Sequence, residues 1–406
     1  METTTLPALT AVRPGRAAVG ALDEATARLD PPFAALDLGA LRANADDLVR
    51  RAGGKPVRVA SKSVRCRWVV EEVLRLPGYA GVLALTLPEA LWLADRVDDV
   101  VVGYPTADRA ALAALAADPR LAARVTLMVD SVESLAFLRA HLPAAAPAIR
   151  ICLELDAALR IGRLHLGARR SPTRDAGALG ALASEVAADA RFRLVGVMGY
   201  EGQIAGVGDD GPDRLRRLPT RAVQAASAWE LARRRAAAVA AVRSVADLEF
   251  VNGGGTGSIE RTVREQAVTE VAAGSGLYGP ALFDQYRAFT PAPAAYFTTA
   301  VVRRPAPGIV TVQGGGWIAS GPVGADRQPV PVWPEGLALT AAEGAGEAQT
   351  PLVGEVADRL RLGDRVWWRH AKAGEFCERV SSLVLVADGA VVGSVPTYRG
   401  DGHAFL

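Results

Sequence analysis

The chain has 406 residues, half of them apolar, and its 46 basic and 44 acidic residues leave a formal net charge of +2. This length exceeds a typical single domain, so we expect two domains. The balanced charge, without a basic stripe, argues against nucleic acid as a partner, and no run of about 18 apolar residues offers a membrane span.

The three cysteines, Cys66, Cys152 and Cys377, are an odd number at wide spacing. Such spacing argues against a disulfide framework and fits a reducing compartment. The first thirty residues hold no apolar stretch long enough for a signal peptide. We therefore expect a cytoplasmic protein.

Residues 1–32 show no clear pattern, and we expect this N-terminal segment to be partly disordered. Over residues 33–286, short apolar runs alternate with stretches rich in Ala, Leu and Arg, a pattern typical of βα units. Eight strands favour an α/β fold, a closed (β/α)₈ barrel of the TIM type. The expected strands are Val57–Ala60, Gly81–Thr86, Val100–Tyr104, Val125–Val129, Ile149–Leu155, Leu194–Gly199, Leu248–Asn252 and Val271–Gly274.

Residues 287–406 differ in texture, because prolines and glycines interrupt short strand-like runs. Turn residues at such short spacing predict a C-terminal all-β domain. Its clearest element is a hairpin in which Ser381–Val386 and Ala390–Val395 are joined by Ala387-Asp388-Gly389.

Lysine is nearly absent, since 43 of the 46 basic residues are Arg and only Lys55, Lys62 and Lys372 remain. Arg serves every ordinary salt-bridge role, so a lysine that persists is a candidate for chemistry that needs a deprotonated amine. Lys62 follows the expected strand Val57–Ala60, and barrel enzymes keep their active sites at the C-terminal ends of strands. The alternative for Lys62 is a structural ion pair. We expect Lys55 in an exposed loop.

Two glycine-rich runs follow the last two barrel strands. They are Asn252-Gly253-Gly254-Gly255-Thr256-Gly257-Ser258 and Gly274-Ser275-Gly276. Backbone N–H groups in such runs can approach an anion closely, and barrels of this class commonly bind phosphate at these two loops. A tight turn would explain either run alone. Together with a strand-end lysine, they indicate pyridoxal phosphate (PLP), whose aldehyde bonds to an amine.

Several ordered motifs resemble the alanine racemase-type (fold type III) barrel family of PLP enzymes, and within it the D-threonine aldolase and D-serine dehydratase branch. The motifs span most of the barrel: Pro32–Asp37 with Asn44, Val57–Ser63, Leu153–Gly162, Gly196–Gly202, Gly253–Gly257 and Glu270–Ser275. The resemblance implies a homodimer whose β domain completes the active site.

The resemblance also assigns the cofactor site. It implies that Lys62 forms the Schiff base and that Tyr200 lines the ring, although Gln203 replaces a histidine of the family motif. A core role is the alternative for Tyr200. The implied phosphate ligands are Gly254, Gly255, Thr256, Gly257, Gly274 and Ser275.

Arg160 takes the position that faces the pyridine nitrogen in the family. An arginine cannot give its proton to the ring, so the nitrogen would stay neutral. Arg160 follows Asp156 one residue sooner than the family spacing, which leaves Arg163 as the second candidate. A strand-end salt bridge is the alternative role for either arginine.

Strand periodicity places His370 and Lys372 on one face of a β-domain strand. The family branch has a His-x-Asp or His-x-Cys pair here that binds a divalent metal, zinc or manganese, beside the substrate hydroxyl. Lys372 occupies the second ligand position, and an ammonium cannot coordinate a metal. Either Glu375 or Cys377 joins His370 as a ligand, or the Lys372 charge replaces the metal while His370 takes the hydroxyl proton. A buried interface role is the alternative for His370.

The resemblance therefore implies a PLP-dependent lyase that cleaves the Cα–Cβ bond of a D-configured β-hydroxy-α-amino acid, as D-threonine aldolase does. Its catalytic residues would be Lys62, His370 and Lys372. The alternatives are β-elimination of the D-serine dehydratase type and racemisation, which needs a second base that no residue here identifies. A PLP carrier without turnover is a further alternative, against which the long β domain argues.

Overall fold

A computed structural model describes residues 6–144 and 146–405. Its larger part is a closed barrel of parallel strands in the order β10-β11-β2-β3-β4-β5-β6-β9. These strands are β2 Val57–Ala60, β3 Tyr79–Ala84, β4 Val100–Val102, β5 Val125–Val129, β6 Ile149–Glu154, β9 Phe192–Gly199, β10 Phe250–Gly253 and β11 Glu270–Ala273. Each expected run forms a barrel strand, so the predicted (β/α)₈ barrel is confirmed.

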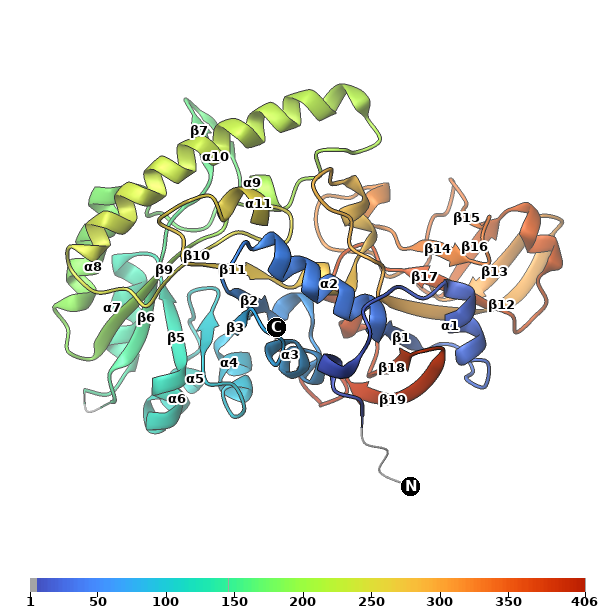
Figure 1. The fold of residues 1–406 in the computed structure, drawn as a ribbon, viewed down its shortest axis with the longest axis horizontal. Helices are drawn as coiled ribbons and strands as arrows, with labels where there is room; N and C mark the ends of the chain where they lie inside the picture. The colour runs from blue at the N-terminus through green and yellow to red at the C-terminus, as the bar shows by residue number, and fades with distance from the viewer. Residues whose placement is uncertain (1–5, 145, 406) are drawn as a thin grey trace.

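Helices surround the barrel, and the longest, α10 (Arg214–Arg243), lies along its outer edge (Figure 1). Most of these helices begin at an Asp, Ser or Thr whose side chain accepts a hydrogen bond from the first turn, as Asp213 does for α10. Among the described residues, no helix is both long and apolar enough to cross a membrane. The other main helices are α2 Leu38–Arg51, α3 Arg67–Leu74, α4 Leu87–Leu93, α5 Arg109–Ala117, α6 Pro119–Arg124, α7 Val132–His141 and α8 Ala176–Ala187.

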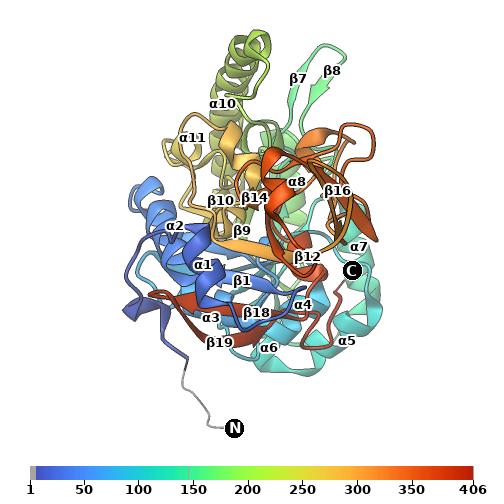
Figure 2. The same cartoon turned by 90° about the vertical axis from the view of Figure 1, so that its right-hand side faces the viewer.

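The β domain lies beside the barrel (Figures 1 and 2). Its described strands form a sheet in the order β15-β16-β13-β12-β1-β18-β19, with β17 paired to β12 and β14 paired to β17. The predicted hairpin is present as β18 and β19, so the all-β character of this domain is confirmed. The strands are β1 Ala34–Asp37, β12 Ala295–Ala306, β13 Ile309–Gln313, β14 Val330–Trp333, β15 Ala338–Leu339, β16 Gln349–Val353, β17 Arg365–Arg369, β18 Ser382–Ala387 and β19 Ala390–Pro396.

The structure differs from the predicted domain boundary at residue 33. Strand β1 lies inside the β-domain sheet, antiparallel to β12 and parallel to β18. Helix α1 (Val19–Ala25) packs there too, because Leu22 joins the core around Trp367 and Asp23 accepts a 2.7 Å hydrogen bond from the Trp367 indole. The expected partial disorder of residues 1–32 includes residues 1–5, which lie outside the described residues. Helix α1 and strand β1 thus belong to the β domain.

Candidate active site

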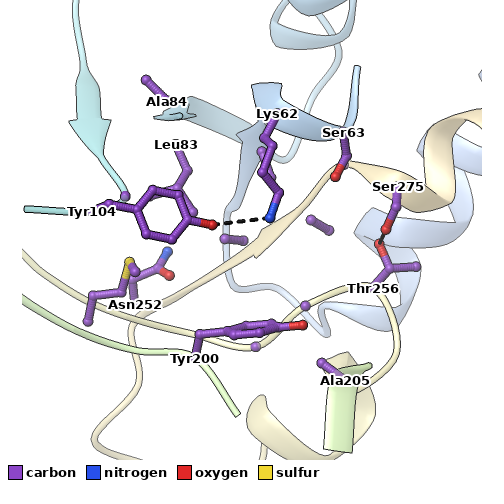
Figure 3. Close-up of a pocket in the computed structure, with 18 of the residues that line it drawn as sticks. Lys62, Ser63, Leu83, Ala84, Tyr104, Tyr200, Ala205, Asn252, Thr256 and Ser275 are labelled. Atoms are coloured by element: carbon purple, nitrogen blue, oxygen red, sulfur yellow. Dashed lines mark hydrogen bonds between the residues drawn. The ribbon is translucent and has the colours of Figure 1, made fainter. Parts of the chain in front are cut away.

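A cavity of about 120 Å³ lies at the C-terminal ends of the barrel strands. Figure 3 shows side chains from several strand ends that converge on it. The polar side chains that line it are Lys62, Ser63, Tyr104, Arg170, Tyr200, Asn252, Thr256 and Ser275.

Lys62 lies in a short 3₁₀ turn, Ser61–Ser63, directly after β2. Its amine points into the cavity and donates a hydrogen bond to the Tyr104 hydroxyl, with 3.1 Å between Nζ and Oη (Figure 3). Tyr104 follows β4 as Lys62 follows β2, so the strand-end rule that selects Lys62 could also have found this tyrosine. The barrel therefore places the Lys62 amine and the Tyr104 hydroxyl within hydrogen-bonding distance of each other.

The loops after β10 and β11 meet at the other side of the cavity. The Ser275 hydroxyl donates to Thr256 Oγ1 over 3.2 Å (Figure 3). The Gly276 N–H donates to the same oxygen over 3.1 Å. A Cβ at Gly274 would lie 2.3 Å from the Ala60 carbonyl oxygen, so only glycine lets these two strand ends approach so closely. The two hydroxyls form a polar corner of the cavity.

The sequence predicts that the backbone N–H groups of the glycine run bind the phosphate, but those of Gly254 and Gly255 have other partners. The Gly254 N–H donates to Glu201 Oε2 over 3.2 Å, and the Gly255 N–H donates to Ser258 Oγ over 3.1 Å. Both N–H groups are therefore engaged within the protein, although both residues line the cavity. Gly257 does not line it, because its backbone packs against Ala205, whose carbonyl oxygen would lie 2.3 Å from an added Cβ. The absence of a side chain at Gly257 therefore allows this close packing.

Glu201 connects the elements behind this corner. Its buried carboxylate accepts hydrogen bonds from the Gly254 N–H, from the Ser258 hydroxyl at 3.1 Å and from the Thr262 hydroxyl, and it pairs with Arg235 at 2.9 Å. Arg235 is itself buried and also pairs with Glu265 at 2.8 Å. A buried charge needs such partners. The ion pair thus fixes the loop after β10 in place.

Tyr200 lies directly before Glu201 and across the cavity from Lys62 (Figure 3). Burial raises the pKa of its hydroxyl to about 12, so this hydroxyl stays neutral in the physiological range. Gln203, which replaces the family histidine, turns away and donates 2.7 Å hydrogen bonds to the Ala157 carbonyl and the Ser227 hydroxyl. The structure thus gives Gln203 a structural role.

The structure does not bring Arg160 to the cavity. Arg160 belongs to β7 (Leu159–Ile161), which pairs with β8 (Leu164–Leu166) in a hairpin that projects from the barrel (Figure 2). Its side chain is 44% exposed and pairs with Asp156 at 2.7 Å. Arg163 lies in the same exposed hairpin. The guanidinium at the cavity is instead that of Arg170, which lies 5.3 Å from the Tyr104 ring centre and 5.5 Å from that of Tyr200.

His370 follows β17 and is only 2% exposed. Its Nδ1 lies 3.3 Å from the Ala295 carbonyl oxygen, while Nε2 has no hydrogen-bond partner in the described part of the chain. Burial lowers its pKa to about 3, and its side chain does not line the cavity. The predicted role of His370 as the base for a substrate hydroxyl therefore lacks both the position and the basicity.

The predicted metal ligands do not converge. Cys377 Sγ lies 3.9 Å from the Tyr278 hydroxyl, and burial raises the thiol pKa well above its usual value, whereas metals bind the thiolate. Glu375 accepts the Ser320 N–H at 3.1 Å. Within residues 6–144 and 146–405, no three His, Cys, Asp or Glu side chains gather as a metal site would need. These residues do not fit a zinc or manganese ion.

Lys372 approaches the cavity from the β domain. Its amine donates to the Ser320 hydroxyl over 3.1 Å, and burial, together with the nearby positive charge of Lys62, lowers its pKa. The loop is held there by Gly374, where an added Cβ would lie 2.4 Å from the Lys62 carbonyl oxygen. The structure therefore brings Lys372 near Lys62, although Lys372 does not line the cavity.

The fold and the site are those of a two-domain barrel protein with a lysine at the first strand end of its cavity. The family described as alanine racemase, N-terminal domain, matches residues 36–281, and the chain belongs to this family. The family expected from the sequence is thereby confirmed. A comparison with curated protein sequences gives no match.

Solved structures share the architecture at low sequence identity. D-threonine aldolase from Filomicrobium marinum has a TM-score of 0.75 and 24% identity, over 92% of this chain and 96% of that one. D-threo-3-hydroxyaspartate dehydratase from Delftia sp. HT23 has a TM-score of 0.67 and 22% identity, over 91% and 97%. Alanine racemase from Bacillus anthracis has a TM-score of 0.59 and 15% identity, over 92% and 99%. At these identities, the likeness establishes the fold.

Proposed function

We propose that this protein is a PLP-dependent lyase that cleaves the Cα–Cβ bond of a D-configured β-hydroxy-α-amino acid, as D-threonine aldolase does. One observation carries the proposal: the Lys62 amine lines the cavity, and the Lys372 amine of the β domain, although not part of the lining, lies near enough for the charge of Lys62 to lower its pKa. A PLP carrier would need only the first amine. The second amine favours an enzyme that moves a proton.

The cavity residues fit the cofactor. Lys62 offers the amine that bonds its aldehyde, the hydroxyls of Thr256 and Ser275 would hold its phosphate, and the Tyr200 ring forms a wall opposite Lys62. When bound, PLP supplies an electron sink for negative charge that develops at the substrate Cα. The donor set near His370 does not fit a metal, so the proposed mechanism routes no step through one.

In this mechanism Lys372 acts as the base. Its lowered pKa increases the neutral fraction of the amine, which can then accept the proton of the substrate β-hydroxyl. The Cα–Cβ bond breaks, the carbonyl fragment leaves as an aldehyde, and the electron pair stays at Cα. A proton from Lys62 then reaches Cα, so D-threonine would give glycine and acetaldehyde. Tyr104 orients the Lys62 amine through its hydrogen bond.

Borohydride reduction of the PLP-loaded protein, followed by peptide mass mapping, tests the cofactor site. We expect an adduct on Lys62, its absence in Lys62→Ala, and equal amounts of aldehyde and glycine from D-threonine. Ammonia and a keto acid in place of these products would establish the elimination alternative. The absence of a chromophore after addition of PLP would show that the proposal is wrong. The homodimer and the cytoplasmic location stay predictions from the sequence.

A further inference from the structure

A second recess adjoins the cavity, between the β7–β8 hairpin and the loop that follows it. Its lining is strongly basic. Arg170 lines both the recess and the cavity, so the two hollows meet at this side chain. The charged and titratable side chains that line the recess are Arg160, Arg163, His165, Arg169 and Arg170.

Most of this positive charge lacks a counter-charge in the described part of the chain. Arg160 pairs with Asp156, but Arg163, Arg169 and Arg170 have neither an acidic partner within 4.0 Å nor a hydrogen bond. The charge of Arg170 acts on the Glu154 carboxyl, but burial raises the pKa of Glu154 to about 7, so this carboxyl is only partly ionised near neutral pH. Three guanidinium groups are thus free to bind an anion, and their planar geometry suits carboxylate and phosphate.

The position of the recess decides which anion can use it. A substrate whose amine reaches Lys62 has its reacting atoms in the cavity, and the recess lies next to the cavity because Arg170 lines both. We propose that this recess binds an anionic group at the far end of the substrate side chain. The preferred substrate is then a D-β-hydroxy-α-amino acid with a distal phosphate or carboxylate. This inference rests on the proposed function.

Binding of unreactive D-amino acids to the PLP-loaded protein tests it, with the cofactor absorbance as the readout. The probes are D-2-amino-5-phosphonopentanoate, D-2-aminoadipate with a carboxylate at the same position, and uncharged D-norvaline. We expect an anionic probe to bind at least about tenfold more tightly than D-norvaline, because charge-assisted hydrogen bonds contribute that much. The ratio of the two anionic probes distinguishes phosphate from carboxylate.

Variants of the recess arginines test whether these side chains cause the preference for anionic probes. In Arg163→Gln/Arg169→Gln, we expect the anionic preference to fall below about threefold while D-norvaline binds as before. The matched control is Arg109→Gln/Arg399→Gln, which removes the same charge from two exposed arginines outside the recess and should keep the preference.

Three results would overturn the inference. The first is equal affinity for all three probes. The second is an equal loss of preference in the control, because the cause would then be net charge. The third is an unchanged absorbance with every probe, which would also contradict the proposed function, whereas binding of D-norvaline alone would leave that function standing.

Discussion

The Lys62 amine donates its hydrogen bond to the Tyr104 hydroxyl over 3.1 Å, and the two residues follow barrel strands β2 and β4, which lie on either side of β3. Tyr104 thereby orients the amine that the proposed function needs. We expect Tyr104→Phe to lower kcat about tenfold, because a misdirected amine loses a favourable approach geometry. The PLP content should remain that of the wild type. An unchanged kcat would show that Tyr104 does not orient Lys62.

Replacement of Lys372 tests the second amine. We expect Lys372→Met to lower kcat/KM by about a hundredfold or more, since a general base contributes on this scale. The cofactor absorbance should persist. Lys55→Met is the matched control, because Lys55 precedes β2, at the opposite end of that strand from Lys62, and its amine donates to the Glu265 carbonyl. Equal turnover in the two variants would remove Lys372 from the mechanism.

Glu201 should act on cofactor affinity without touching the cofactor. We expect Glu201→Gln to weaken PLP binding about tenfold and to lower the free energy of unfolding by about 3 kcal/mol, because buried Arg235 loses a charged partner. Titration of the apoprotein with PLP and urea unfolding measure the two effects. The control is Glu249→Gln, which breaks ion pairs with Arg150 and Arg193 at the opposite end of β10. A stability loss in Glu201→Gln with unchanged affinity would contradict the positioning role.

Dialysis against EDTA should leave turnover unchanged. The physical reason is the donor set: the His370 imidazole and the Cys377 thiol have separate partners, and in the described part of the chain no three His, Cys, Asp or Glu side chains gather. Re-addition of Zn²⁺ or Mn²⁺ should not raise the rate. A rate that falls with EDTA and recovers with one of these ions would show that a metal site forms from other residues.

The buried His370 should make the stability of the folded protein depend on pH. Burial lowers its pKa from 6.5 to about 3, so between these values only the unfolded chain binds the proton. Its contribution to stability is therefore complete above pH 6.5 and decreases as the pH falls. Urea unfolding at pH 7.5 and pH 5 should show a smaller decrease in His370→Gln than in the wild type. Equal decreases would mean that His370 is protonated in the folded state.

The barrel could be predicted because its signal is local. Short apolar runs such as Val125–Val129 are buried on both faces, and each one coincides with a strand of the structure. Lys62 could be predicted for a related reason, since position after a strand and the scarcity of lysine are both visible in the sequence. The place of strand β1 in the β domain could not be predicted, because its partners β12 and β18 lie more than 250 residues away in the chain.

The features of the candidate site also fall into two groups, those visible in the sequence and those that depend on tertiary packing. The sequence by itself determined the barrel, the lysine at its first strand end, and the two glycine runs opposite, because these depend on the order of residues along single strands. Only the tertiary structure decided that Arg170 and not Arg160 reaches the cavity, that His370 is sealed in the β domain, and that Lys372 lies beside Lys62. These outcomes depend on how a projecting hairpin and a second domain pack against the barrel, and spacing along the chain does not encode such long-range packing.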